Sequence, residues 1–111
     1  MRVLFDQGTP IPLRSAIEKH TISTAYELGW STLKNGELLQ AAEDAGFEVL
    51  VTTDTNLKYQ QNLAARKISV VVLTSTSWPR IRAVSNQVSA AIETSSVGSY
   101  LEVAIPYLPL A

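Results

Sequence analysis

The segment that most constrains the fold is residues 68–73, which read ISVVVL and are rich in β-branched, apolar side chains. A continuous run of this kind is typical of a strand that is buried on both faces in the middle of a parallel sheet. Residues 47–52 (FEVLVT) have the same character. Because such strands need helices on both sides, we expect an α/β protein.

The rest of the chain alternates between strand and helix patterns. We predict further strands over residues 2–5, 21–25 and 100–105, and helices over residues 11–19, 35–45, 57–65 (or a helical loop) and 79–94. Asn35 is expected to cap its helix, Gly46 to end it, and Gly8 to take a positive φ. The order predicts a three-layer α/β/α sandwich with a mostly parallel sheet, one domain over residues 1–105 and a loose tail over residues 106–111.

Composition limits the classes of protein that fit. The 111 residues are 46% hydrophobic and 17% charged, which is ordinary for one globular domain. We expect no transmembrane helix, because no run approaches the roughly 20 apolar residues that a span needs, and no secretion signal, because the apolar segment before Asp6 is short. The absence of cysteine excludes disulfides and thiolate metal sites. A cytoplasmic location is the simplest expectation.

Charge gives little indication of a partner. Nine Lys and Arg residues against ten Asp and Glu residues leave a net charge of −1, so no overall positive field attracts nucleic acid. Only residues 58–82 are mildly basic, with five Lys and Arg residues. An ordinary solvated surface is the simpler interpretation of that stretch.

Acidic residues follow two of the predicted strands. Asp6 comes after the first strand, Asp54 comes after residues 47–52, and Glu37 lies in the first turn of the helix that Asn35 opens. Ligands of open α/β sheets bind outside the carboxyl ends of the strands, so these acids converge there if the strands are neighbours. Such oxygens suit Mg²⁺ or Mn²⁺, which can activate water and stabilise a phosphodiester's charge. The alternative is that the aspartates cap loops and Glu37 caps a helix.

Several other side chains have both a functional and a structural interpretation. The amides of residues 60–62 can orient water, a metal ligand or a nucleobase edge, or can belong to a solvated helix face. Trp78 can stack on a base, or pack in the core or a dimer contact, as can Trp30. His20, the only histidine, is expected to act as a cation at a helix end. Phosphate-binding glycine loops and the GxSxG motif of hydrolases are absent.

Three segments together resemble a known family. Residues 5–14 (FDQGTPIPLR), residues 29–73 with their TTDTNLKYQQNL run, and residues 76–82 (TSWPRIR) are similar to the DUF5615 group of PIN-like proteins. These are small bacterial proteins related to toxin ribonucleases of the VapC type. The resemblance extends to about residue 105 and implies a PIN-like domain that binds Mg²⁺ or Mn²⁺ through acids and cuts RNA. It also implies a toxin–antitoxin pair, with an antitoxin of the DUF433 type, and a homodimer.

The resemblance assigns roles to individual residues. Asp6 and Asp54 correspond to the metal-binding aspartates of PIN domains, and Glu37 is the nearest candidate for the third acid. Gln7, Asn35 and Asn56 are amides where relatives often have acids, and with Gln61 they are assigned to orienting water or substrate. Because amides lower the negative charge and weaken metal binding, two functions remain open. These are a metal-dependent endoribonuclease and a catalytically weak PIN-like module that binds RNA or protein.

Overall fold

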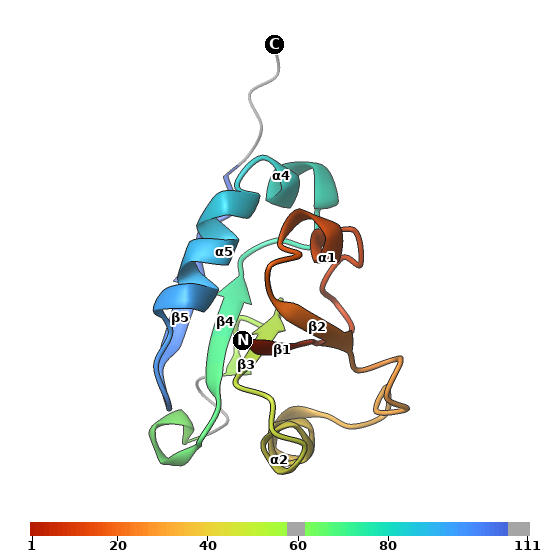
Figure 1. Cartoon of the computed structure of the whole chain (residues 1–111), viewed down its shortest axis with the longest axis vertical. Coiled ribbons are helices and arrows are strands. Elements are labelled where there is room, and N and C mark those ends of the chain that lie inside the picture. Colours follow the sequence, from red (N-terminus) through yellow and green to blue (C-terminus); the bar gives the residue numbers. More distant parts are fainter. Residues whose placement is uncertain (58–61, 107–111) are drawn as a thin grey trace.

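The protein folds around a five-stranded sheet in which every strand is parallel to its neighbours. The computed structural model describes residues 1–57 and 62–106, and for Asn35 only the backbone. The strand order is β2-β1-β3-β4-β5 (Figure 1). The strands are β1 (Arg2–Phe5), β2 (Thr21–Thr24), β3 (Val49–Thr52), β4 (Ser69–Leu73) and β5 (Tyr100–Val103).

Helices cover both faces of this sheet, so the predicted three-layer α/β/α sandwich is confirmed (Figure 1). One face packs against α1, α4 and α5, and the other against α2 and the short 3-10 helix η1. The helices are α1 (Leu13–Ala16), α2 (Asn35–Asp44), η1 (Leu63–Ala65), α4 (Trp78–Arg82) and α5 (Ser85–Thr94). Among the residues described, no helix combines the length and apolarity that crossing a bilayer requires.

The two apolar runs in the sequence form the strands with the most complete burial. Every residue of β3 and β4 is buried. Successive side chains of a strand point to opposite faces, so Val49 and Val51 join the cluster under α1, α4 and α5, whereas Leu50 joins the cluster under α2. A strand that contributes to two cores must be apolar at both alternating sets of positions, which explains the continuous runs.

The strand predictions are confirmed, with ends that differ by one or two residues. The helix predictions need more correction. Helix α2 begins at Asn35 and its N-cap is Lys34, so the prediction that Asn35 is the cap is wrong. The α2 helix ends as predicted, because Gly46 has φ +85° and its N–H bonds to the carbonyl of Glu43. Helix α1 is only the short piece Leu13–Ala16 of the predicted 11–19. Part of the predicted helix 57–65 lies outside the described residues.

The predicted helix over residues 79–94 is in fact two helices. Val84 has φ −123° and ψ 24°, which breaks the helix between α4 and α5. The break does not change which side chains face the core, because Ile81 and Val88 both enter the same apolar cluster.

Gly8 also differs from expectation. It is not among the glycines with positive φ within the described residues. Instead, a Cβ on Gly8 would lie 2.3 Å from Oγ1 of Thr53. The position therefore favours glycine because the loop after β1 lies against the side chain of Thr53, which follows β3 and leaves no room for a Cβ.

The strands that follow β1 and β3 lie toward opposite edges of the sheet, since β1 leads to β2 and β3 leads to β4. From β1 the chain passes through α1 to β2 on one side, and from β2 it returns through α2 on the other face to β3 (Figure 1). The carboxyl ends of β1 and β3 are thus a topological switch point, the place where open α/β sheets bind ligands.

Candidate functional site

Asp6 lies at the carboxyl end of β1, beside β3. Phe5 pairs with Val51 in the sheet, and the N–H of Asp6 continues the pairing with a 2.9 Å hydrogen bond to the carbonyl of Val51. Leu4 faces the α2 side of the sheet, and Asp6 is two residues further along the strand. The alternation of side chains therefore directs the Asp6 carboxylate toward the α2 side.

The hydroxyl of Thr52 connects this carboxylate to the loop that carries Asp54. Thr52 Oγ1 donates to Oδ2 of Asp6 at 2.8 Å and accepts the N–H of Asp54 at 3.1 Å. Thr52 is only 1% exposed, so its position is determined by the core. The carboxylate of Asp54 in turn accepts the N–H of Asn56 at 2.9 Å, which forms an Asx turn.

Both aspartates line one cavity of about 290 Å³. It opens between the carboxyl ends of β1 and β3 and the segment that leads into α2. Its described lining residues are Asp6, Gln7, Ser31, Leu33, Lys34, Leu38 and Asp54. The cavity therefore holds two carboxylates, one ammonium and one hydroxyl above an apolar floor.

The other predicted site residues are distributed around this cavity. Gln7 lines it, and the Gln7 N–H donates to Oδ1 of Asp6 at 2.8 Å. Asn56 is exposed on the turn after Asp54. Glu37 is exposed in the first turn of α2 and is not among the described lining residues. The side chain of Asn35 and the whole of Gln61 lie outside the described part of the chain.

The structure brings together two of the three predicted acids. Over residues 1–57 and 62–106, no group of three or more His, Cys, Asp or Glu side chains is close enough to hold a metal ion. Lys34, which the sequence did not single out, occupies the lining next to the aspartates. Its position one residue before α2 was a usable signal, because the start of α2 was already predicted to face this end of the sheet.

The two tryptophans are used in packing. Trp30 makes an edge-to-face contact with Phe47, with ring centroids 6.2 Å apart. The guanidinium of Arg2 lies over the Phe47 ring, 4.7 Å from its centroid. Trp78 is partly buried against the core under α4. Among the described residues, Tyr26 is an exposed aromatic ring near the site, at 75% exposure. Sequence reasoning missed it, because nothing in the local pattern around this tyrosine indicates whether its ring is exposed.

His20 does not act as a cation at a helix end, and that prediction is wrong. Helix α1 ends at Ala16 and His20 is only 8% exposed. Burial lowers the pKa of His20 below its usual 6.5, and the positive N-terminus acts in the same direction. Its Nε2 lies 3.5 Å from Oγ of Ser89, while Nδ1 has no hydrogen-bond partner within the described residues. Within the described residues, the Ser89–His20 pair therefore lacks the third group that orients the histidine of a catalytic triad.

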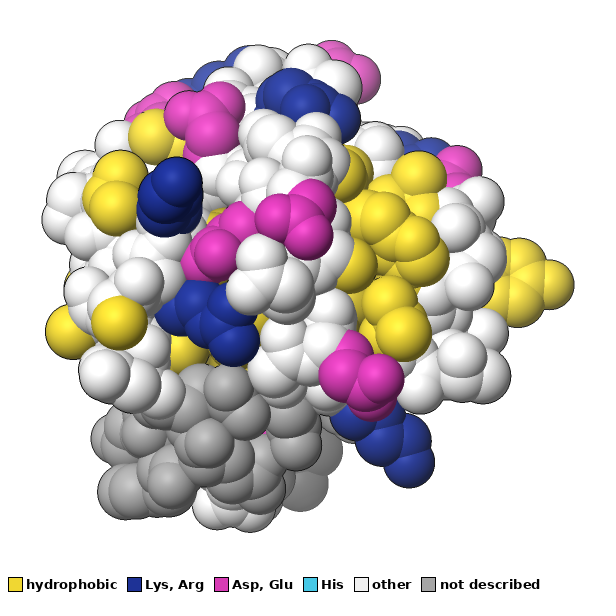
Figure 2. Space-filling model, turned by 90° about the horizontal axis from the view of Figure 1, so that it is seen from below, with side chains coloured by type: hydrophobic (Ala, Val, Ile, Leu, Met, Phe, Trp, Pro, Cys, Tyr) yellow, Lys and Arg dark blue, Asp and Glu magenta, His cyan; other side chains and the backbone are white. Residues whose placement is uncertain are grey.

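Two of the five basic residues in the mildly basic stretch make structural contacts. Arg66 pairs with Glu43 at 3.7 Å and bonds to Gln40, and Arg80 donates to the carbonyls of Ile105 and Pro106. Figure 2 shows basic and acidic side chains interspersed on the face that it presents, with hydrophobic side chains at several places on the left and in a larger group on the right. These contacts favour the interpretation of this stretch as an ordinary surface.

Comparison with known proteins adds no assignment. Searches against protein-family models, curated proteins and solved structures found no match for the chain.

Proposed function

We propose that the chain is a PIN-like, metal-dependent endoribonuclease whose site is the cavity between β1 and β3. The observation that carries the proposal is that Asp6 and Asp54, from two neighbouring parallel strands, line the same cavity at the switch point of the sheet. The resemblance to the DUF5615 group of PIN-like proteins, carried by residues 5–14, 29–73 and 76–82, supports the same conclusion.

The residues fit a hard divalent cation. Mg²⁺ is commonly held by one or two carboxylates, with waters and substrate phosphate completing its octahedron. Six waters occupy about 180 Å³ at about 30 Å³ each, which the cavity of about 290 Å³ can accommodate. The hydrogen bonds from Gln7 and Asn56 to the two carboxylates leave lone pairs on their oxygens and orient them.

A bound Mg²⁺ or Mn²⁺ would supply an activated water and charge stabilisation at the phosphodiester. The side chains of the protein then have separate tasks. Asp6 and Asp54 hold the cation, with Glu37 helping through water. Lys34 neutralises charge on the phosphate, and the amides of Gln7, Asn35, Asn56 and Gln61 orient water and substrate.

The second candidate is a module that binds RNA or protein without cleaving it. The composition of the cavity favours this alternative, because Lys34 lines it together with the two carboxylates and reduces their attraction for a cation. Two carboxylates beside one ammonium leave a net charge of only about −1, whereas a third acid would strengthen metal binding.

A calorimetric titration with Mn²⁺ tests the proposal. Wild type should bind Mn²⁺ and cleave a labelled single-stranded RNA, and Asp6→Asn and Asp54→Asn should each lose both properties. Asp44→Asn is the matched control, because Asp44 is an exposed aspartate near the end of α2 and makes only a local bond to Gln40. Absence of Mn²⁺ binding by wild type would reject the nuclease and favour the module that binds RNA or protein without cleaving it.

The biological setting is part of the same proposal. We place the protein in the cytoplasm as the toxin of a pair, restrained by an antitoxin of the DUF433 type, and active as a homodimer. The apolar segment at residues 100–110 also motivates the dimer, and its last residues, 107–110, lie outside the described part of the chain. Light scattering at micromolar concentration tests the dimer directly.

A further inference from the structure

We propose that Tyr26 and Ile11 form a stacking subsite for one base of the RNA, directly beside Asp6. The inference rests on the proposed function, since it names where the nucleotide next to the cleaved phosphate is held. It concerns a second cavity, of about 220 Å³, between the loop after β1 and the turn after β2.

This second cavity adjoins the aspartate cavity at two shared residues. Asp6 and Gln7 line both of them. A ligand that fills both places therefore has one part beside the carboxylates and another part beside Tyr26. A nucleotide has this form, with a phosphate that belongs at the cation and a flat base attached through the sugar.

The size and chemistry of the cavity suit a single base. Its volume lies below the roughly 300–1,000 Å³ typical of sites for drug-sized ligands, which indicates one ring system and not a whole cofactor. Phe5 and Ala25 form an apolar floor, and the exposed Gln7 contributes a polar group at the rim. The buried Thr9 and Thr24 also line the cavity. An apolar floor matches the face of a base, and polar groups at a rim match its edge.

The exposure of the two apolar side chains also needs a reason. Tyr26 is 75% exposed and Ile11 is 62% exposed, and both line this cavity. Scattered exposed apolar side chains are normal, but two large ones at the mouth of one cavity mark a binding surface. Aromatic rings on which bases stack are a recurrent device of proteins that bind single-stranded RNA.

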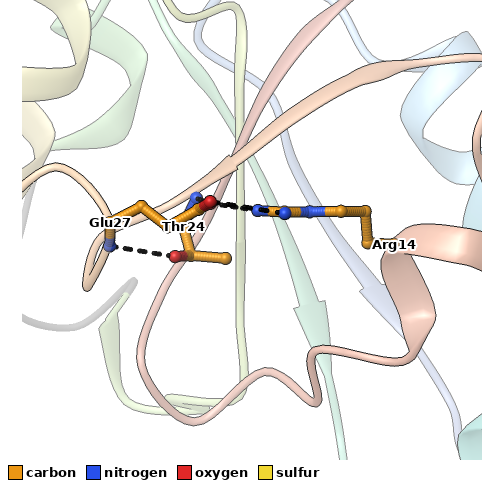
Figure 3. Close-up of polar contacts among 3 residues, drawn as sticks. All are labelled: Arg14, Thr24 and Glu27. Atoms are coloured by element: carbon orange, nitrogen blue, oxygen red, sulfur yellow. Dashed lines mark hydrogen bonds and ion pairs between the residues drawn. The ribbon is translucent and has the colours of Figure 1, made fainter.

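The turn that carries Tyr26 is held in place before any ligand arrives. The N–H of Thr24 donates to Oε1 of Glu27 at 2.9 Å, and the N–H of Glu27 donates back to Oγ1 of Thr24 at 3.1 Å. Arg14, from α1, forms an ion pair with the same carboxylate (Figure 3). Residues 24–27 are thereby fastened to α1, so less entropy is lost when a base stacks on the ring.

The test measures binding of a fluorescent single-stranded oligouridine by anisotropy, in Mn²⁺ and in EDTA. Tyr26→Ala should weaken binding by about 5- to 150-fold, the range for loss of one base–aromatic stack, and Tyr26→Phe should retain it. Val97→Ala is the control, because Val97 is equally exposed, at 76%, but lines a different cavity. An abasic strand of the same length should bind wild type and Tyr26→Ala with equal affinity.

The outcomes separate this inference from the proposed function. Normal Mn²⁺ binding and RNA cleavage, with oligouridine affinity unchanged in Tyr26→Ala, would overturn the subsite and leave the nuclease intact. If wild type binds neither Mn²⁺ nor RNA, both the subsite and the proposed nuclease function are overturned. If Tyr26→Ala instead converts a dimer to a monomer in light scattering with unchanged RNA affinity, the ring serves a contact between two copies and the subsite is rejected.

Discussion

The hydroxyl of Thr52 donates a 2.8 Å hydrogen bond to Oδ2 of Asp6, across the boundary between β3 and β1. The same oxygen accepts the N–H of Asp54. One buried hydroxyl therefore fixes the position of one carboxylate and the direction of the loop that carries the other.

Thr52→Val should disturb the site while keeping the shape of the core. The change removes one bond to a charged group and leaves the Asp54 N–H without its acceptor, at a cost of about 1–3 kcal/mol in the free energy of unfolding. Loss of an orienting partner should reduce Mn²⁺ affinity about 10-fold or more. Urea denaturation and calorimetry measure the two effects.

Two matched variants accompany that experiment. Thr52→Ser keeps the hydroxyl and should keep most of the Mn²⁺ affinity. Thr21→Val makes the same chemical change at an exposed position of β2 and should leave both measurements unchanged. Equal Mn²⁺ affinity in Thr52→Val and wild type would show that the hydroxyl does not support a cation site.

Gly8→Ala should destabilise the protein through a single contact. The added Cβ meets Thr53 Oγ1 at 2.3 Å, so the threonine must rotate or shift. We expect a loss of about 1 kcal/mol in unfolding free energy, at the lower end of the range for overpacking, because the obstacle is one hydroxyl.

Thr53→Ala removes that obstacle and provides the internal control for Gly8→Ala. The double variant should be more stable than the sum of the two single effects predicts, which a double-mutant cycle in urea detects. Additive effects would mean that the backbone conformation at Gly8, and not the contact, is what matters.

The layered fold and the position of its acids could be predicted because they depend on local pattern. The runs at residues 47–52 and 68–73 had to be buried on both faces, and parallel strands bring their carboxyl ends to one edge of a sheet. The proximity of Asp6 and Asp54 follows from those two facts once β1 and β3 are neighbours.

Properties that depend on tertiary context could not be predicted in this way. The exposure of Tyr26, the burial of His20 and the break at Val84 have no counterpart in the local sequence pattern. Glu37 illustrates the same limit at the site. It lies in the predicted first turn of α2, but its neighbour Leu38 is the residue that lines the cavity. A rotation of about 100° between successive helix residues separates the two directions.

His20 should make stability depend on pH near neutrality. Its pKa in the folded protein is below the usual 6.5, chiefly because of burial, and the charges of the N-terminus and Lys19 outweigh the opposite effect of Glu93. Between the folded pKa and 6.5 the unfolded chain binds more protons, so stability falls as pH is lowered through this window. The slope for one group is at most about 1.4 kcal/mol per pH unit.

Urea denaturation from pH 5 to 8 measures this dependence. His20→Gln should flatten the profile between the folded pKa of His20 and 6.5, whatever its effect on absolute stability. A profile with the same slope in the variant would assign the pH dependence to other groups.

Glu27 should make stability depend on pH in the acid range. Its hydrogen bond from Arg14, followed by the bond from the N–H of Thr24, lowers the pKa of Glu27 below its ordinary 4.5. The bonds that this carboxylate accepts therefore contribute fully above pH 4.5, and their contribution is lost as pH falls through the folded pKa.

Thermal denaturation between pH 3 and pH 6 tests the role of Glu27. Glu27→Gln should lose part of the acid dependence of the melting temperature seen in wild type, and Glu18→Gln, at another exposed position, should not. Since Glu27 is exposed, the effect on stability is expected to be small. Its effect on the turn that carries Tyr26 should be easier to detect, as faster hydrogen exchange at the N–H groups of Thr24 and Glu27. Unchanged exchange in Glu27→Gln would show that this carboxylate does not hold the turn in place.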